Sequence, residues 1–227
     1  MEGVMEDLLF APPALGSVLS LTGLPGGGNK IQDRSAYGNS GTITGASWVK
    51  LPSGFWVLSF DGVDDYVSCG NEPSLNIAAQ VTMAAWTKAE YYASGTSMKL
   101  LLSKHSDYSG GLTLAYTGGT VYPHFRLMIN GNPYYAQNTA DHKDAWHCFV
   151  GTYDGKTIRL YADGREIGST VVSGTIDSNS EPVRMGGGVA GRYVKGLISL
   201  ARIYHRALSA FEIQNLFSCE KNLFGVW

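Results

Sequence analysis

The sequence has few charged residues and no block of like charge. Charged side chains make up 16% of the 227 residues, and the formal net charge is −2. Proteins that are held electrostatically on nucleic acid or on anionic membranes carry clustered basic residues. The composition therefore predicts neither a nucleic-acid partner nor a membrane-surface partner.

Long apolar runs are also missing. No segment reaches the roughly 18 uninterrupted apolar residues that a membrane-spanning helix needs, which predicts no membrane insertion. The opening MEGVMEDLLF is acidic where a signal peptide is positively charged, so no signal peptide is evident. The three cysteines, Cys69, Cys148 and Cys219, are too widely spaced for a disulfide framework. A single Cys69–Cys219 bridge stays open beside the favoured interpretation of small buried apolar residues.

Several catalytic and cofactor motifs are absent or out of context. No G-x-S-x-G elbow occurs, and no Glu has an Asp two positions later, as the E-x-D-x-x-E of laminarinase-type sandwich enzymes requires. GGGVAG (186–191) matches G-x-G-x-x-G, but strand-like sequence follows it instead of a helix. His142, His147 and Cys148 lack a second cluster to complete a zinc site, so satisfied or solvated histidines are favoured. We predict a protein without enzymatic activity, with a divergent glycan hydrolase or lyase as the alternative.

Glycine is abundant instead, at 29 residues, together with 13 tyrosines. The segments VTMAAW (81–86) and KLLLSK (99–104) are short apolar runs between polar loops, as strands are. Asn130-Gly131, Asp154-Gly155 and Asp163-Gly164 are dipeptides that favour type I′ hairpin turns. The chain is therefore predicted to be all-β, an antiparallel sandwich or barrel.

One helix is predicted near the C-terminus. Ser209 is suited to cap it, and Glu212 completes a capping box. Leu208 and Ile213 are spaced as a hydrophobic staple, and Ile213 and Leu216 give the helix an apolar face. We expect a short helix against the edge of a sheet.

The stretch LSFDGVDDYVSC (58–69) concentrates three aspartates, Asp61, Asp64 and Asp65. They lie around a glycine turn instead of alternating along one strand, so a catalytic carboxylate pair is the least favoured interpretation. Calcium takes six to eight oxygen ligands, and an aspartate-rich turn supplies several of them. A structural turn is favoured, with a calcium site formed by these three residues as the open alternative.

Two tyrosine doublets are candidate ligand contacts. Tyr91-Tyr92 and Tyr134-Tyr135 lie at or near predicted loops. Sugar rings have apolar faces that stack on aromatic rings, and tyrosine adds a hydrogen-bonding hydroxyl. In a strand one tyrosine of each pair would point into the core, so packing is the alternative.

Four segments, taken in order, resemble the laminin-G-like jelly roll of the concanavalin A-like, pentraxin-related group. They are LSFDGVDDYVSC, VTMAAWTKA, WHCFVGTYDGKTIRLYADGREIG and GLISLARIYHRALSAFEIQNLF. The resemblance spans about residues 31–217 and implies two antiparallel sheets of six or seven strands each. We expect one domain over residues 1–227, with a lead-in (1–30), a core (31–217) and a C-terminal tail (218–227).

The resemblance also implies a non-catalytic recognition or adhesion module that binds carbohydrate or another exposed surface ligand, often with calcium. At Gly196-Leu197-Ile198-Ser199-Leu200 the chain lacks the acidic pair that this family usually has there, which weakens the calcium expectation. The alternative is a structural or decoration protein of a larger particle, such as a virion or surface layer. Either implies an extracellular or particle-surface location and display in several copies.

Overall fold

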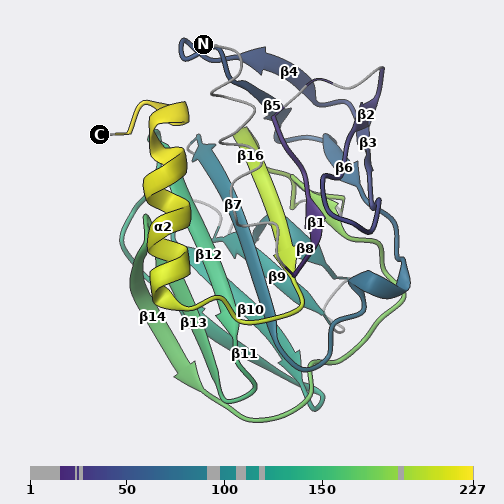
Figure 1. The fold of residues 1–227 in the computed structure, drawn as a ribbon, viewed down its shortest axis with the longest axis vertical. Helices are drawn as coiled ribbons and strands as arrows, with labels where there is room; N and C mark the ends of the chain where they lie inside the picture. Colours follow the sequence, from purple (N-terminus) through teal and green to yellow (C-terminus); the bar gives the residue numbers. More distant parts are fainter. Residues whose placement is uncertain are drawn as a thin grey trace.

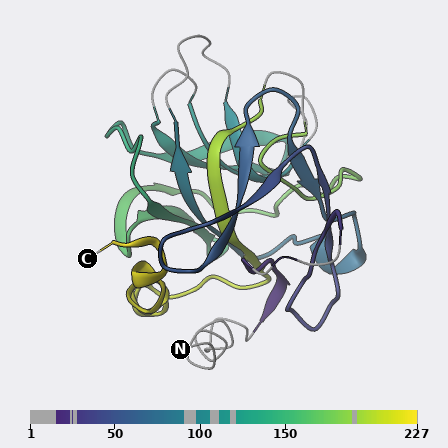
Figure 2. The ribbon, with the colours of Figure 1, turned by 90° about the horizontal axis from the view of Figure 1, so that it is seen from above.

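Two antiparallel sheets stack face to face in the computed structural model, which describes residues 16–23, 25, 28–90, 98–105, 111–117, 121–188 and 192–226 (Figures 1 and 2). The first sheet has the order β14-β13-β12-β7-β16-β5-β4, and β1 also pairs with β16. Its strands are β1 (Ser17–Ser20), β4 (Ser47–Lys50), β5 (Trp56–Asp61), β7 (Val81–Ala89), β12 (His147–Tyr153), β13 (Thr157–Ala162), β14 (Arg165–Val171) and β16 (Lys195–Tyr204). The predicted all-β sandwich is confirmed.

The second sheet has the order β11-β10-β9-β8-β15-β6-β3-β2. Its strands are β2 (Lys30–Ile31), β3 (Gly41–Thr44), β6 (Tyr66–Ser68), β8 (Lys99–Lys104), β9 (Leu112–Tyr116), β10 (Pro123–Ile129), β11 (Asn132–Gln137) and β15 (Arg184–Met185). Each described sheet thus has eight strands, not the six or seven expected. The additions include two-residue strands, β2 and β15, which are too short to show a periodic sequence pattern. Another addition, β1, lies within the expected lead-in, and its Leu19 is fully buried.

The hairpin turns follow the dipeptides that predicted them. Asn130 and Gly131 have φ angles of 51° and 79° between β10 and β11, and Asp163 and Gly164 have 52° and 79° between β13 and β14. These positive angles at both central residues are those of a type I′ turn. Asp154 differs: its φ is not positive, and its Oδ1 accepts hydrogen bonds from the backbone N–H groups of Lys156 and Thr157. That connection is a three-residue loop stabilised by the aspartate side chain, so the type I′ prediction was wrong there.

The main hydrophobic core lies between the sheets. The first sheet contributes residues such as Phe60, Met83 and Phe149, and the second contributes Leu114 and Phe125. Gly151 in β12 makes a close approach possible, because a Cβ at this position would lie 2.2 Å from the Phe125 ring.

The predicted capping box begins helix α2 (Ala210–Glu220): the Ser209 side chain accepts from the Glu212 backbone N–H, and the Glu212 carboxylate accepts from that of Ser209. A short 3-10 helix, η3 (Lys221–Phe224), follows, and another, η2 (Pro73–Leu75), precedes β7. Helix α2 lies on the side of the first sheet that faces away from the second sheet (Figures 1 and 2). The sequence predicted this helix at the edge of a sheet, and that prediction was wrong. The helix covers the face of the first sheet, because its apolar side packs in one cluster with side chains from five strands.

A second apolar cluster fills the space between α2, η3 and the first sheet. The Trp86 ring stacks on the Phe224 ring with a centroid separation of 4.3 Å. Beside it, Glu220 accepts a hydrogen bond from Trp86 Nε1 at 2.7 Å and pairs with Arg202 Nη2 at 2.6 Å. The outer face of the first sheet is therefore closed by the end of its own chain.

All three cysteines are free, Cys69 and Cys148 being buried and Cys219 exposed. The Cys69–Cys219 alternative is not realised, because Cys69 lies in the core between the sheets while Cys219 is on helix α2. Among the described residues, no helix has the length and apolar character needed to cross a membrane.

Candidate functional site

A continuous row of polar side chains crosses the outer face of the second sheet. In the strand pairing, Lys30 is opposite Thr42, Thr42 opposite Ser68, and Ser68 opposite Arg184. The same register continues through Ser103, Thr113, Arg126 and Tyr135. Directly opposite residues share one face of a sheet. We name these eight residues the polar row; one member comes from each strand.

The alternation along the strands assigns the polar row to the outer face. In β10, Phe125 and Leu127 belong to the core between the sheets, so Arg126 points the other way. The same holds for Thr113, which is flanked by the core residues Leu112 and Leu114. This face is thus lined with hydroxyl groups and cations.

Arg126 has an unusual environment at the centre of this face. The residue is 4% exposed, yet no carboxylate of the described residues pairs with it. Its Nε donates to the Tyr135 hydroxyl at 3.2 Å, and Nη2 contacts the weak acceptor Met128 Sδ at 3.0 Å. Nη1 is buried without a hydrogen-bond partner, and so is Oγ1 of the neighbouring Thr113. Buried polar groups without partners are uncommon in folded proteins, and Arg126 shares this property with other described residues such as Tyr116 and Ser199.

The charges of the second sheet all have one sign. Its strands contain five cations, Lys30, Lys99, Lys104, Arg126 and Arg184, and neither Asp nor Glu occurs in any of the eight. Burial lowers the pKa of His124, beside Arg126, to about 4, so its imidazole is neutral at physiological pH. Glu181, from the loop before β15, pairs with Arg184 at 3.4 Å.

The tyrosines proposed from sequence fall in different environments. Tyr134 is partly buried and packs against the core between the sheets. Tyr135 is 39% exposed on the outer face, where its ring lies 5.8 Å from the Arg126 guanidinium. Tyr91 and Tyr92 lie outside the described residues. A role of these tyrosines in ligand binding stays a prediction.

The three aspartates of the opening stretch do come together. Asp61, Asp64 and Asp65 each offer a carboxylate oxygen, and these oxygens lie within 4.8 Å of one another. The turn joins β5 of the first sheet to β6 of the second, so the cluster is at the rim of the sandwich. Three oxygens at this spacing are a partial ligand set for a metal ion.

Hydrogen bonds within the turn explain its shape. Asp61 Oδ1 accepts from the backbone N–H of Val63 at 2.8 Å, and Asp65 Oδ2 accepts from that of Asp61 at 2.8 Å. Burial, and then the neighbouring charges of Asp61 and Asp64, raise the pKa of Asp65. The predicted structural turn is present, and its carboxylates repel one another.

The two histidines considered as zinc ligands, His142 and His147, each contact a different partner. His147 Nδ1 lies 2.7 Å from Asp163 Oδ2, and His142 Nδ1 lies 2.7 Å from the Ala140 carbonyl oxygen. Cys148 is buried on the other face of β12, in the cluster beneath α2. Within the described part of the chain, the three aspartates are the one group of three or more such side chains close enough to hold a metal.

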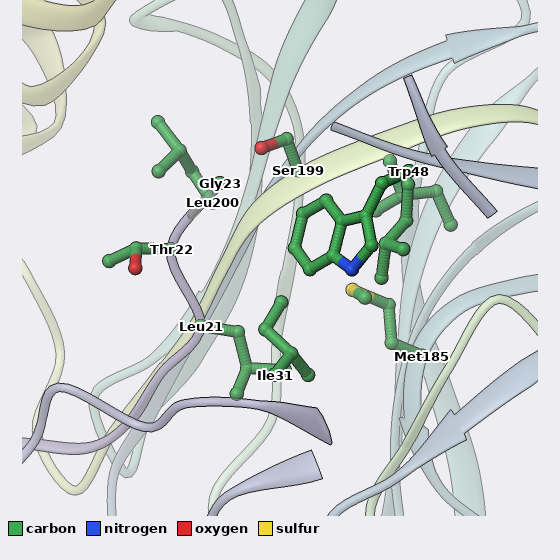
Figure 3. A pocket seen from close by; sticks show the side chains of 10 residues that line it. Leu21, Thr22, Gly23, Ile31, Trp48, Met185, Ser199 and Leu200 are labelled. Carbon is green, nitrogen blue, oxygen red and sulfur yellow. The ribbon is translucent and has the colours of Figure 1, made fainter. Parts of the chain in front are cut away.

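A small gap near β16 offers no ligand site. Apolar residues such as Leu21, Ile31 and Met185 line it, together with Trp48 and Ser199 (Figure 3). The space among them has no room for a water molecule. It is a packing defect beside the irregularity between Ser199 and Arg202 in β16.

Sequence reasoning missed Arg126 and Thr113. The signal was present in PHFRLMI (123–129), where His124, Arg126 and Met128 alternate with apolar residues. Alternation indicates that one face is not part of the core. It does not tell which cation on that face lacks a counter-ion, because that depends on residues distant in sequence.

The two-sheet sandwich agrees with a known family of β-sandwich domains. Residues 61–214 match the family described as the concanavalin A-like lectin/glucanases superfamily, and the chain belongs to that family. Comparison with curated protein sequences found no match.

Among solved structures, the binding domain of Paraclostridial Mosquitocidal Protein 1 superposes with a TM-score of 0.77 at 18% identity, covering 94% of this chain and 56% of that one. The botulinum neurotoxin serotype G binding domain gives 0.67 at 14% identity, with coverages of 90% and 51%. This chain therefore spans about half the length of these toxin domains.

Domain 4 of AbnA, a GH43 extracellular arabinanase from Geobacillus stearothermophilus, was solved in complex with arabinotriose. It matches with a TM-score of 0.62 at 17% identity, covering 82% of this chain and 91% of that one. At these identities the likeness concerns the fold.

Proposed function

We propose that this chain is a non-catalytic recognition module that binds carbohydrate on the outer face of its second sheet. The polar row carries this proposal, because it aligns hydroxyls and cations from eight strands on one face of a rigid scaffold. Its ends, Lys30 and Tyr135, are exposed, whereas Ser103, Thr113 and Arg126 in its middle are buried. The outer face of the first sheet is covered by α2 and η3.

The chemistry of the row suits a sugar. The exposed Tyr135 ring offers a surface for stacking, and its hydroxyl, which accepts a hydrogen bond from Arg126 Nε, is a polar group beside that surface. Acid–base hydrolysis of a glycosidic bond needs two carboxyl groups across the sugar. The strands of this sheet supply none, which supports binding without cleavage.

The likeness to an arabinanase domain solved with arabinotriose supports the same proposal at the level of fold. Weak binding by one site becomes useful when several copies are displayed together, so we expect a multivalent context outside the cell or on a particle surface. A purely structural role in a particle is the competing function. It predicts a folded protein that binds no glycan.

Glycan-array binding by the purified protein, followed by titration calorimetry on the best ligand, tests the proposal. Tyr135→Ala should weaken binding by about tenfold through loss of stacking. Tyr37→Ala is the matched control, because Tyr37 is exposed by 49% and lies outside the second sheet. No binding on the array, or equal loss in both variants, would contradict the proposal.

The aspartate cluster is proposed as a calcium site that supports the same module. Its support is the close approach of three carboxylate oxygens at the junction between the sheets. Asp64→Ala should leave the melting temperature unchanged in EDTA and lower it only in millimolar calcium. An equal melting temperature of wild type with calcium and with EDTA would retire the metal site while leaving glycan binding untouched.

A further inference from the structure

We infer that the loop of residues 138–146 opens in acid, because two neutral histidines in contact with each other hold it closed. The loop connects β11 of the second sheet to β12 of the first. His142 lies within the loop, and His147 begins β12. The inference goes beyond glycan binding, since it concerns how this rim of the sandwich responds to pH.

The two histidine rings cover one end of the core. Their centroids are 4.8 Å apart with an interplanar angle of 85°, so the rings meet edge to face. Both also pack on the ring of Phe149, at centroid distances of 5.3 Å for His142 and 5.9 Å for His147. Phe149 is fully buried in the core between the sheets. Because the histidine rings touch, a proton on each would place two like charges in direct contact, which disfavours the closed arrangement.

Two backbone hydrogen bonds join the loop to both sheets. The N–H of His142 donates to the Val121 carbonyl at 3.3 Å, and that of Asp144 donates to the Ala89 carbonyl at 2.9 Å. Val121 precedes β10 of the second sheet, and Ala89 ends β7 of the first. Movement of His142 away from His147 would break these bonds. The two amides therefore report whether the loop is closed.

Two carboxylates interact with His142, and each has another partner. Asp163, in the turn between β13 and β14, has Oδ2 at 2.7 Å from His147 Nδ1. Asp141, in the loop itself, pairs with Lys143 at 3.1 Å. A proton on His142 therefore adds a positive charge next to His147 without a carboxylate of its own.

The other elements that pack against the loop do not change this balance. At the end of β7, Glu90 pairs with Lys195 at 3.1 Å. Lys88 precedes the core residue Ala89 in the same strand, so its side chain points to the other face of the sheet. Residues 121–123, before β10, include no charged side chain.

The direction of the pKa shift agrees with this geometry. Burial lowers the pKa of His142 below its ordinary value of 6.5, and His147 lowers it further, against the opposing effects of the Ala140 carbonyl, Asp163 and Asp141. The unfolded chain therefore binds this proton more tightly, and the stability of the closed loop falls as pH falls from 6.5 through the lowered pKa. Most residues of the loop are exposed, so we expect it to open before the strands unfold.

Amide hydrogen exchange followed by NMR tests the inference on the intact chain. Between about pH 7 and about pH 5, the protection factors of the His142 and Asp144 amides, corrected for intrinsic exchange, should fall at least about tenfold. The amides of β12 and β13 should keep their protection. The midpoint of opening should coincide with the titration of the His142 imidazole, followed through its ring resonances.

His142→Gln removes the proton-binding group and keeps a side chain that can donate to the Ala140 carbonyl. The loop of this variant should be as protected at about pH 5 as at about pH 7. His147→Gln removes the second charge and should move the opening to lower pH. His205→Gln is the matched control, because His205 is exposed and follows Tyr204, which pairs with Thr82 at the opposite end of β7 from Ala89. This control should open as the wild type does.

Equal protection of the wild-type loop at both pH values would overturn the inference. An acid loss of protection that is unchanged in both glutamine variants, or that the β12 and β13 amides share, would do the same. If His142→Gln is already unprotected at neutral pH, the shift in His147→Gln and the imidazole titration of the wild type decide the outcome. None of these measurements involves a glycan, so the proposed function stands or falls separately.

Discussion

Each sheet has a buried arginine on its outer face, Arg202 on the first sheet and Arg126 on the second. The two are equally buried but differ in whether a carboxylate lies beside them. Arg202 and Arg126 are both 4% exposed. Arg202 lies beneath helix α2 and is neutralised by Glu220 at 2.6 Å, although its Nη1 also lacks a hydrogen bond. Arg126 forms no ion pair with a carboxylate of the described residues. Two arginines with the same burial therefore have different electrostatic surroundings, one with a carboxylate partner and one without a partner among the described residues.

The same contrast applies to the two outer faces as a whole. On the first sheet, apolar side chains from the strands pack against α2 and η3. On the second sheet, the corresponding face carries the polar row. If this comparison is right, substitutions beneath α2 will change the free energy of unfolding, and substitution of the exposed Tyr135 in the polar row will change ligand binding.

The largest effect is expected for Trp86→Ala. Trp86 is fully buried and stacks on Phe217 and Phe224, so its removal leaves a large cavity beneath α2. The free energy of unfolding should fall by about 3–5 kcal/mol, measured by urea denaturation. A loss below about 1 kcal/mol would show that α2 and η3 are not held on the sheet as described.

A somewhat smaller loss is expected for Glu220→Gln, which keeps a hydrogen-bond acceptor for Trp86 but removes the negative charge beside Arg202. The cost should be about 3 kcal/mol, because it leaves a buried cation unpaired. The double variant Arg202→Met, Glu220→Gln is the control and should recover much of this stability. Failure to recover it would mean that the pair does not act through its charges.

Asp65→Asn should change the stability of the folded protein modestly, and the sign of the change should depend on pH and on calcium. The folded-state pKa of Asp65 is raised above its ordinary value of 3.8, so the folded protein binds the proton more tightly than the unfolded chain does. The ionised residue therefore reduces stability as pH rises from 3.8 through the raised pKa, and the full reduction is present at neutral pH.

Thermal melting of wild type and Asp65→Asn in EDTA checks this expectation. The asparagine variant should be more stable at neutral pH, and the difference should vanish below pH 3.8. With calcium at neutral pH, wild type alone should gain stability. A variant that is less stable than wild type in EDTA at neutral pH would show that the carboxylate stabilises the turn.

The smallest change in stability is expected for Thr113→Val in the polar row. Its hydroxyl has no partner, so removing it should alter the free energy of unfolding by less than about 1 kcal/mol. Affinity for the glycan should stay at the wild-type value, because the Thr113 side chain is fully buried and does not reach a ligand. A loss of more than about 1 kcal/mol in the free energy of unfolding would show that the hydroxyl has a hydrogen-bond partner in the folded protein.

Local features of the fold were predictable because neighbouring residues determine them. Asn130-Gly131 and Asp163-Gly164 adopt the positive φ angles that their turns require, and the Ser209 capping box begins α2 where expected. The side-chain turn around Asp61 is of the same kind. Each of these depends on a few consecutive residues.

Features that depend on distant residues were not predictable. Trp86 and Glu220 are 134 residues apart, so nothing near Ser209 shows that α2 covers a face instead of an edge. The polar row joins one residue from each of eight strands, and only the register aligns them. The sequence pattern identified Tyr135 as a candidate but gave no sign that Arg126 donates a hydrogen bond to its hydroxyl, because that contact is a property of the assembled sheet.

The position of the aspartate turn has a mechanical consequence. The turn is the loop that connects β5 in the first sheet to β6 in the second. We expect an ion bound there to hold the two sheets together at the rim of the sandwich. It would slow their separation without contacting the outer face of the second sheet. Calcium in the surroundings would then set how long the domain survives proteases, while the sugar it meets would set where it is retained.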